Sequence, residues 1–119
     1  MLRQILPPLI AFALPILAAL LGLTDALGAH ISWDVKTILI GAPIGVLLAF
    51  LLALVWPNKT KTTILWVLLL VCAFAIAKYG QTAFVNSYGD DQFAGKLWYF
   101  GWIATGAAAA GTIFAAIRR

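Results

Sequence analysis

A histidine, a serine and an aspartate lie close together in this chain, and they are the residue types of a nucleophilic triad. His30 and Asp34 are four residues apart, so one helical turn would bring them together, with Ser32 between them in sequence. A working nucleophile also needs a rigid scaffold, oxyanion donors and a pocket that excludes water. The short connection around these residues offers none of these, and we expect a protein that is not an enzyme.

All four acidic residues are aspartates, and clustered carboxylates could collect a divalent cation. Asp34, Asp90 and Asp91 instead precede apolar segments, where a carboxylate caps free amides and favours the helix dipole. The ligand spacing of a calcium loop is missing. The single cysteine excludes an internal disulfide, and the single histidine excludes a two-histidine haem or metal site. We therefore expect no metal ion and no cofactor.

Lys78 is the one charge well inside an apolar segment. It lies 15 residues after Thr63, or about 22 Å along a helix at about 1.5 Å per residue. A charge inside a membrane is a functional-site candidate, and Gln81 is a polar neighbour one turn away. The alternative is that the flexible stem lifts the ammonium towards the membrane surface. Asp25 is the expected partner, because it ends a helix, where the dipole disfavours a negative charge.

Small residues are the most patterned feature of the chain. One set repeats every four residues and so lies on one helical stripe, and a second set lies in the last apolar segment. The first set is Gly41, Gly45, Ala49 and Ala53, and the second is Gly101, Gly106 and Gly111. In lipid, small residues let helix backbones approach closely and gain van der Waals contact. These positions predict either packing among the chain's own helices or docking of a partner chain.

The segments that carry these residues are apolar enough to cross a membrane. Hydrophobic residues make up 64% of the 119 residues, charged residues only 10%, and the mean hydropathy is +1.02. Soluble domains are about 45–50% apolar and about 25% charged. A crossing helix needs about 20 apolar residues. Four stretches meet this requirement: Ile5–Thr24, Ile38–Trp56, Thr63–Phe84 and Leu97–Ile117.

Backbone amides in lipid must be satisfied within their own segment, so these four stretches are predicted to be helices. The first stretch resembles a signal peptide, but its apolar run is longer than usual and contains three prolines. We therefore predict a retained first helix, kinked near Pro15. The expected fold is all-α: one domain over residues 1–119, a polytopic membrane protein with four transmembrane helices in an up-down bundle.

Basic residues indicate how the bundle lies in the membrane. Five of the eight fall on one side of a four-span chain: Arg3, Lys59, Lys61, Arg118 and Arg119. The other side has Lys36 and Lys96 together with all four aspartates. Short loops rich in Lys and Arg stay in the cytoplasm. Both termini and the 57–62 loop are thus predicted to be cytoplasmic, and the 25–37 and 85–96 loops extracytoplasmic, in the inner (plasma) membrane.

Three functions are open from the sequence. The first is an accessory or assembly subunit, or a partner-binding element, of a larger inner-membrane complex, since the loops are too short for independent chemistry. The second is a small oligomeric transporter or pore, including a holin-like one, in which Lys78 would attract an anion. The third is an immunity-type binding protein whose outer loop, with Asp90 and Asp91, contacts an extracellular molecule. The expected partners are the lipid bilayer and other membrane subunits or a homo-oligomer, and no nucleic acid.

The chain resembles small multidrug-resistance transporters in its size and four-helix layout. That family is expected to carry a membrane-embedded glutamate in its first helix, and this chain contains no glutamate and no acidic residue within Ile5–Thr24. The resemblance therefore ends at the layout, and the sequence assigns no family.

Overall fold

The structure is a computed structural model that describes residues 2–30 and 33–118, with side chains from residue 4 onward. Within these residues the secondary structure is entirely helical, as the sequence predicts. The helices are α1 (Leu2–Leu20), α2 (Leu23–Leu27), α3 (Asp34–Val55), α4 (Lys59–Asn86) and α5 (Gln92–Ile117).

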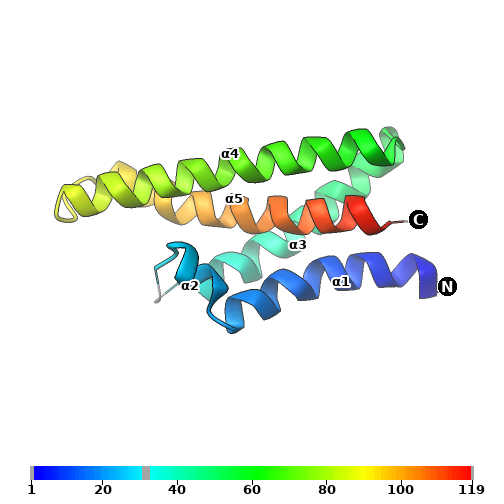
Figure 1. Cartoon of the computed structure of the whole chain (residues 1–119), viewed down its shortest axis with the longest axis horizontal. Coiled ribbons are helices and arrows are strands. Elements are labelled where there is room, and N and C mark those ends of the chain that lie inside the picture. The colour runs from blue at the N-terminus through cyan, green and yellow to red at the C-terminus, as the bar shows by residue number, and fades with distance from the viewer. Residues whose placement is uncertain (1, 31–32, 119) are drawn as a thin grey trace.

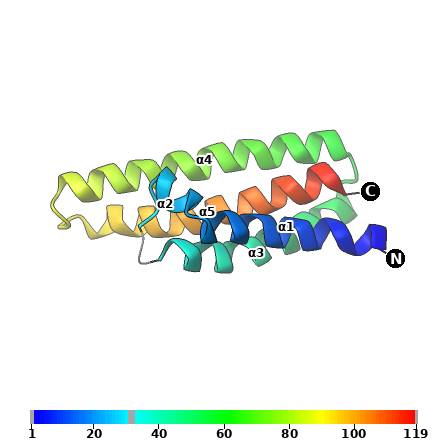
Figure 2. The same cartoon turned by 60° about the horizontal axis from the view of Figure 1, so that its bottom comes forward.

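The four long helices run antiparallel in chain order (Figure 1). Both chain ends and the α3–α4 turn lie at one end of the bundle, whereas α2 and the α4–α5 turn lie at the other (Figures 1 and 2). Helix α5 is the hub, because α4, α3 and α1 all pack against it. In the described part of the chain, α1 packs on α5 and α3 but not on α4.

Three helices, α3, α4 and α5, are long and apolar enough to cross a membrane. The 28 residues of α4 and the 26 of α5 span about 42 Å and about 39 Å at about 1.5 Å per residue. Both exceed the hydrocarbon thickness of about 30 Å. The joined ends of α4 and α5 accordingly extend beyond α1 and α3 (Figure 1).

The first apolar segment differs from the single helix expected over Ile5–Thr24. Helix α1 ends at Leu20 and α2 starts at Leu23. The interruption comes at Gly22, whose φ of 92° is left-handed, a conformation that glycine adopts without steric cost. Helix α1 continues through Pro15 to Leu20, so the break in the first apolar segment lies at the glycine.

The small-residue stripe of α3 faces α5. A Cβ atom added at Gly45 would overlap the backbone carbonyl of Ala107, and one added at Gly41 would overlap the carbonyl oxygen of Ile103. The two backbones are thus in direct contact. Ala49 is buried in the same layer, and Ala53 is partly buried against it.

The small residues of α5 face its other neighbours. A Cβ at Gly101 would lie 2.8 Å from the Cα of Ala77 in α4, and Gly111 lies beneath the ring of Trp66. Gly106 packs against Ile38 of α3. All seven small residues singled out in the sequence are therefore placed in contacts within the chain.

The core is built of small and aromatic residues, and the large aliphatic side chains point outward. Buried alanines line the contacts of α5, together with Trp102, which is 1% exposed. Leucines such as Leu47 and Leu54 are exposed. Lipid tails are as apolar as leucine, so outward leucines cost nothing in a bilayer. The indole N–H groups of Trp66 and Trp102 have no acceptor among the described residues, so these rings contribute packing.

We expect Gly45→Leu to destabilise the protein, because the new side chain meets the Ala107 backbone, which cannot rotate away as a side chain can. Overpacking costs about 1–3 kcal/mol, and a backbone clash belongs at the upper end of that range. Thermal unfolding in detergent, followed by tryptophan fluorescence, measures the effect. Ala104→Leu, at an exposed position of α5, is the control and should leave the midpoint unchanged. Equal midpoints for both variants would contradict the packing assignment.

Candidate functional site

Side chains from α4 and α5 hold the C-terminal end of α2. The Lys78 ammonium donates to the carbonyl oxygen of Leu27 at 3.3 Å, and the Trp98 indole N–H donates to that of Gly28 at 2.8 Å. Lys78 also donates to Oε1 of Gln81 at 3.0 Å. The last carbonyls of a helix lack intrahelical partners, and here two distant helices supply the donors. We call these five residues the α2 clasp.

The α2 clasp requires a glycine at its centre. Gly28 has a φ of 117°, which L side chains rarely adopt. An added Cβ would also lie 2.6 Å from Oε1 of Gln81 and 2.7 Å from Nζ of Lys78. Gly28 thus allows both the left-handed backbone conformation and the close approach of Lys78 and Gln81.

Lys78 makes no ion pair among the described residues, which include all four aspartates. The predicted pairing with Asp25 is not formed: Asp25 is exposed on α2, and the ammonium donates to uncharged oxygens instead. An ammonium carries three donors. Two are used in the α2 clasp, so the half-buried cation can take one more acceptor.

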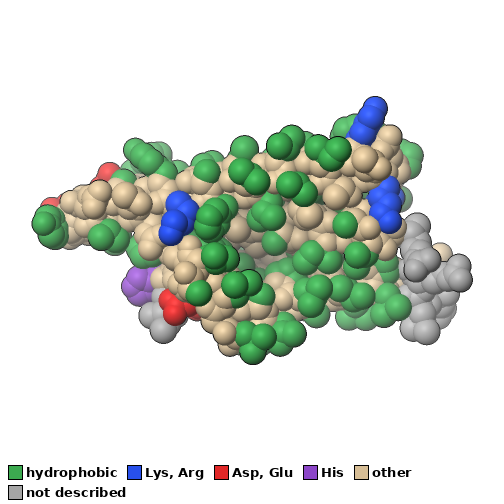
Figure 3. All heavy atoms as spheres, in the orientation of Figure 1, with side chains coloured by type: hydrophobic (Ala, Val, Ile, Leu, Met, Phe, Trp, Pro, Cys, Tyr) green, Lys and Arg blue, Asp and Glu red, His purple; other side chains and the backbone are tan. Residues whose placement is uncertain are grey.

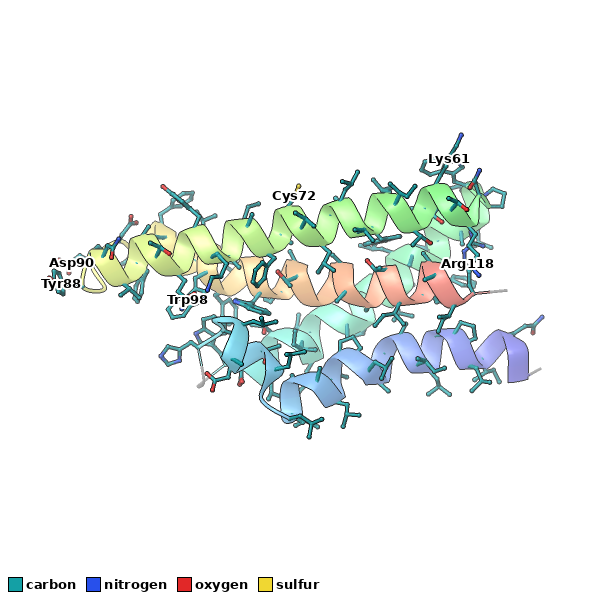
Figure 4. The ribbon with its side chains drawn as sticks, viewed as in Figure 1. Lys61, Cys72, Tyr88, Asp90, Trp98 and Arg118 are labelled. Carbon is teal, nitrogen blue, oxygen red and sulfur yellow. The ribbon has the colours of Figure 1, made fainter. Side chains whose placement is uncertain are left out.

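An aromatic cluster surrounds the α2 clasp. The ring centroids of Trp33 and Trp98 are 5.2 Å apart with an interplanar angle of 75°, and Tyr99 packs edge-on against Trp33 at the same distance. His30 stacks on Trp33 and meets Trp98 at 5.6 Å. Figure 4 shows Trp98 directed from α5 towards α2. Edge-to-face pairs stabilise beyond their buried area, so the cluster fastens the connection between α2 and α3 to α5.

Sequence reasoning missed this cluster. It gave Trp33 no role and did not link it to Trp98 or Tyr99. The available signal was positional: Trp33 directly precedes one crossing segment, and Trp98 opens another on the same side of the chain. Of the three residues with the chemistry of a triad, His30 belongs to the aromatic cluster, and Ser32 lies outside the described residues.

The aspartates lie at separate places. Asp34 is buried at the start of α3, where its Oδ1 accepts from the Val35 amide at 2.8 Å. Asp91 caps α5 by accepting from the Ala94 amide at 3.0 Å. Asp90 is exposed beside it. In the part of the chain that the structure describes, no three histidine, cysteine or acidic side chains come together as metal ligands would.

The turn between α4 and α5 presents exposed aromatic rings. We call residues 87–93 the hairpin tip; it contains Tyr88, 94% exposed, and Phe93, 70% exposed. Tyr88 has a φ of 56°, which is unusual for a bulky residue and costs on the order of 1–3 kcal/mol. The turn is closed by a bond from the Gly89 amide to the Phe84 carbonyl at 3.0 Å. Tyr88 and Asp90 lie at the far end of the molecule (Figure 4).

The opposite end of the bundle is basic. The Arg118 guanidinium donates to the Pro57 carbonyl at 3.0 Å and so ties the end of α5 to the α3–α4 turn. Lys59 and Lys61 are exposed on the first turn of α4, and Lys61 and Arg118 lie at the same end (Figure 4). Cys72 points away from the bundle on the outer face of α4.

No known protein family, curated protein or solved structure matches this chain. Two features of this chain are candidates for a functional site. One is the Lys78 ammonium of the α2 clasp, which has an unused donor, and the other is the hairpin tip at the same end of the bundle, with its exposed aromatic and acidic residues.

We expect Trp98→Phe to loosen α2, because the smaller phenyl ring stays aromatic but cannot donate to the carbonyl of Gly28. One such bond contributes about 0.5–1.5 kcal/mol. Amide hydrogen exchange in residues 21–30 of the detergent-purified protein should become faster, with a small drop in the unfolding midpoint. Trp56→Phe, at an exposed indole near the other end, is the control. Unchanged exchange in residues 21–30 would show that the bond does not hold α2.

Proposed function

We propose that the protein is a non-enzymatic accessory or assembly subunit of a larger membrane complex, which binds its partner through the hairpin tip. The observation that carries this proposal is the exposure of Tyr88 and Phe93 on a hairpin that extends beyond the other helices (Figure 1). Large exposed aromatic rings beside charged residues are typical of surfaces that bind other proteins.

The packing of the small residues supports this choice of surface. Gly41, Gly45 and Gly101 touch helices of their own chain, so these stripes are not available to a partner. A partner must therefore bind the outer helix faces, which lipid also covers, or the parts that extend beyond them. The hairpin tip is such a part, with two highly exposed aromatic rings beside the exposed Asp90.

The conformation of Tyr88 also supports this role. A bulky residue at positive φ stores strain, and such strain is found at functional sites more often than elsewhere. Glycine could occupy the position without that cost. A tyrosine placed there holds a nearly fully exposed ring outward beside the Asp90 carboxylate, an arrangement that suits a partner with basic and apolar groups.

We further propose four crossings, with both termini in the cytoplasm and the hairpin tip outside the inner membrane. Helix α1 would be the fourth crossing, since it lies antiparallel to α3 along the bundle (Figure 1). The basic residues Lys59, Lys61 and Arg118 gather at the end where both termini lie. Cytoplasmic loops carry this excess of positive charge.

Cysteine labelling tests this orientation. In a Cys72→Ser background, Tyr88→Cys should react in intact cells with a maleimide that cannot cross the membrane. Asn58→Cys, in the α3–α4 turn, should react only after the membrane is permeabilised. Labelling of both positions, or of Asn58→Cys alone, in intact cells would contradict the proposed orientation.

Variants of the hairpin tip test the partner. Tyr88→Gly relieves the strained φ, and Phe93→Ser and Asp90→Asn remove the second ring and the charge without touching the cap at Asp91. Purified in mild detergent from the cells that naturally produce it, the wild-type chain should retain a stoichiometric partner that the triple variant loses, roughly tenfold or more in retained amount.

Tyr79→Ser is the matched control, because Tyr79 is also an exposed tyrosine but lies on α4 away from the hairpin tip. The Tyr79→Ser variant should retain the partner. Both this control and the triple variant should unfold at the wild-type temperature or above. Equal retention by the triple variant would exclude the tip as the contact. A partner that is a secreted molecule rather than a membrane subunit would favour an immunity-type binding protein over an assembly subunit.

A further inference from the structure

A groove runs along the bundle between α1 and α4, and we call it the α1–α4 groove. It has a volume of about 540 Å³. Pro15 and Leu27 contribute to one wall, Val71 and Phe74 to the other, and Trp102 lies in its floor on α5. Figure 3 shows this face as a recess between two rows of hydrophobic side chains. The groove exists because α1 and α4 both pack on α5 but not on each other.

The lining of the groove is apolar, and its few polar groups are already engaged. The buried hydroxyl of Thr105 donates to the Gly101 carbonyl at 2.7 Å. The hydroxyl of Thr24 lies 3.5 Å from a carboxylate oxygen of Asp34. The groove therefore offers no free hydroxyl to a polar ligand, and its natural contents are hydrocarbon.

One end of the groove carries a positive charge. Leu27 lines the groove, and its carbonyl accepts from Lys78, which follows the groove residue Phe74 by one turn of α4. No carboxylate pairs with this ammonium among the described residues, and one of its three donors is unused. Gln81, beside it, carries two further amide donors.

The position of Lys78 along α4 places this charge at the membrane surface. If the basic first turn of α4 at Lys59 lies at the inner boundary, about 30 Å of hydrocarbon covers about 20 residues at about 1.5 Å each. The outer boundary then falls at Tyr79, next to Lys78. The lysine is at the level of lipid headgroups, and the α1–α4 groove below it is at the level of their tails.

We propose that the α1–α4 groove binds one anionic phospholipid, with an acyl chain between α1 and α4 and the phosphate on Lys78 and Gln81. The volume of about 540 Å³ falls within the range of about 300–1,000 Å³ of ligand pockets. The phosphate supplies the negative charge that the ammonium lacks, through a charge-assisted hydrogen bond. This proposal depends on the chain crossing a membrane and is independent of the partner at the hairpin tip.

Native mass spectrometry of the full chain in neutral detergent tests this site, with phosphatidylglycerol as the probe and phosphatidylcholine for comparison. Wild type should retain one phosphatidylglycerol molecule in preference to phosphatidylcholine. Lys78→Gln should weaken that retention about tenfold, the loss expected for one charge-assisted bond. Lys96→Gln, the same charge change near the same end of the bundle, should leave it unchanged.

A second pair of variants tests the hydrocarbon part. Ala75→Trp fills the groove and should abolish retention, whereas Ala104→Trp, exposed on α5 outside the groove, should not. Unfolding midpoints show whether each variant is folded. Equal retention of phosphatidylglycerol by the Lys78 and Lys96 variants would overturn the proposal. It would also be overturned if wild type formed dimers without bound lipid and these dimers disappeared in Ala75→Trp, because a second copy of the chain would then occupy the groove. The triple variant of the hairpin tip should keep its lipid, so loss of the partner and loss of the lipid are separable results.

Discussion

The whole bundle depends on the close approach of α5 to two neighbouring backbones. Gly41 and Gly45 bring α3 against it, and Gly101 brings α4 against it. In lipid there is little hydrophobic force between helices, so contact of this kind must supply the cohesion that a soluble core takes from burial. Because α1 and α4 both pack on α5 but not on each other, the α1–α4 groove remains between them.

Part of this arrangement could be predicted from composition and spacing. Length and hydropathy are sufficient for the helical class, and a four-residue repeat of small residues identifies the face that α3 turns to a neighbour. The break at Gly22 was not foreseen, because a single glycine in an apolar run does not reveal whether it will adopt a left-handed φ. The three prolines were the more obvious candidates, yet α1 continues through them.

The α2 clasp shows why the site was harder to predict than the fold. Lys78 and Gln81 were singled out as polar residues within a span. Lys78 donates to Gln81 and to the backbone carbonyl of Leu27, which lies in a short helix more than 50 residues away. Such acceptors have no side-chain signature, since any residue can provide a carbonyl. The sequence therefore favoured Asp25, a carboxylate at a helix end where the dipole disfavours its charge, over an uncharged partner that depends on how α2 is folded.

The lack of contact between α1 and α4 has a consequence for biosynthesis. Helix α1 is made first, but α5, one of the two long helices on which it packs, is made last, about 70 residues later at the nearest ends of the two helices. Until α5 is made, α1 can pack only on α3 among the long helices. Helix α1 is therefore incompletely packed through most of translation. A chain truncated before Gln92 would lack the helix on which α1, α3 and α4 all pack.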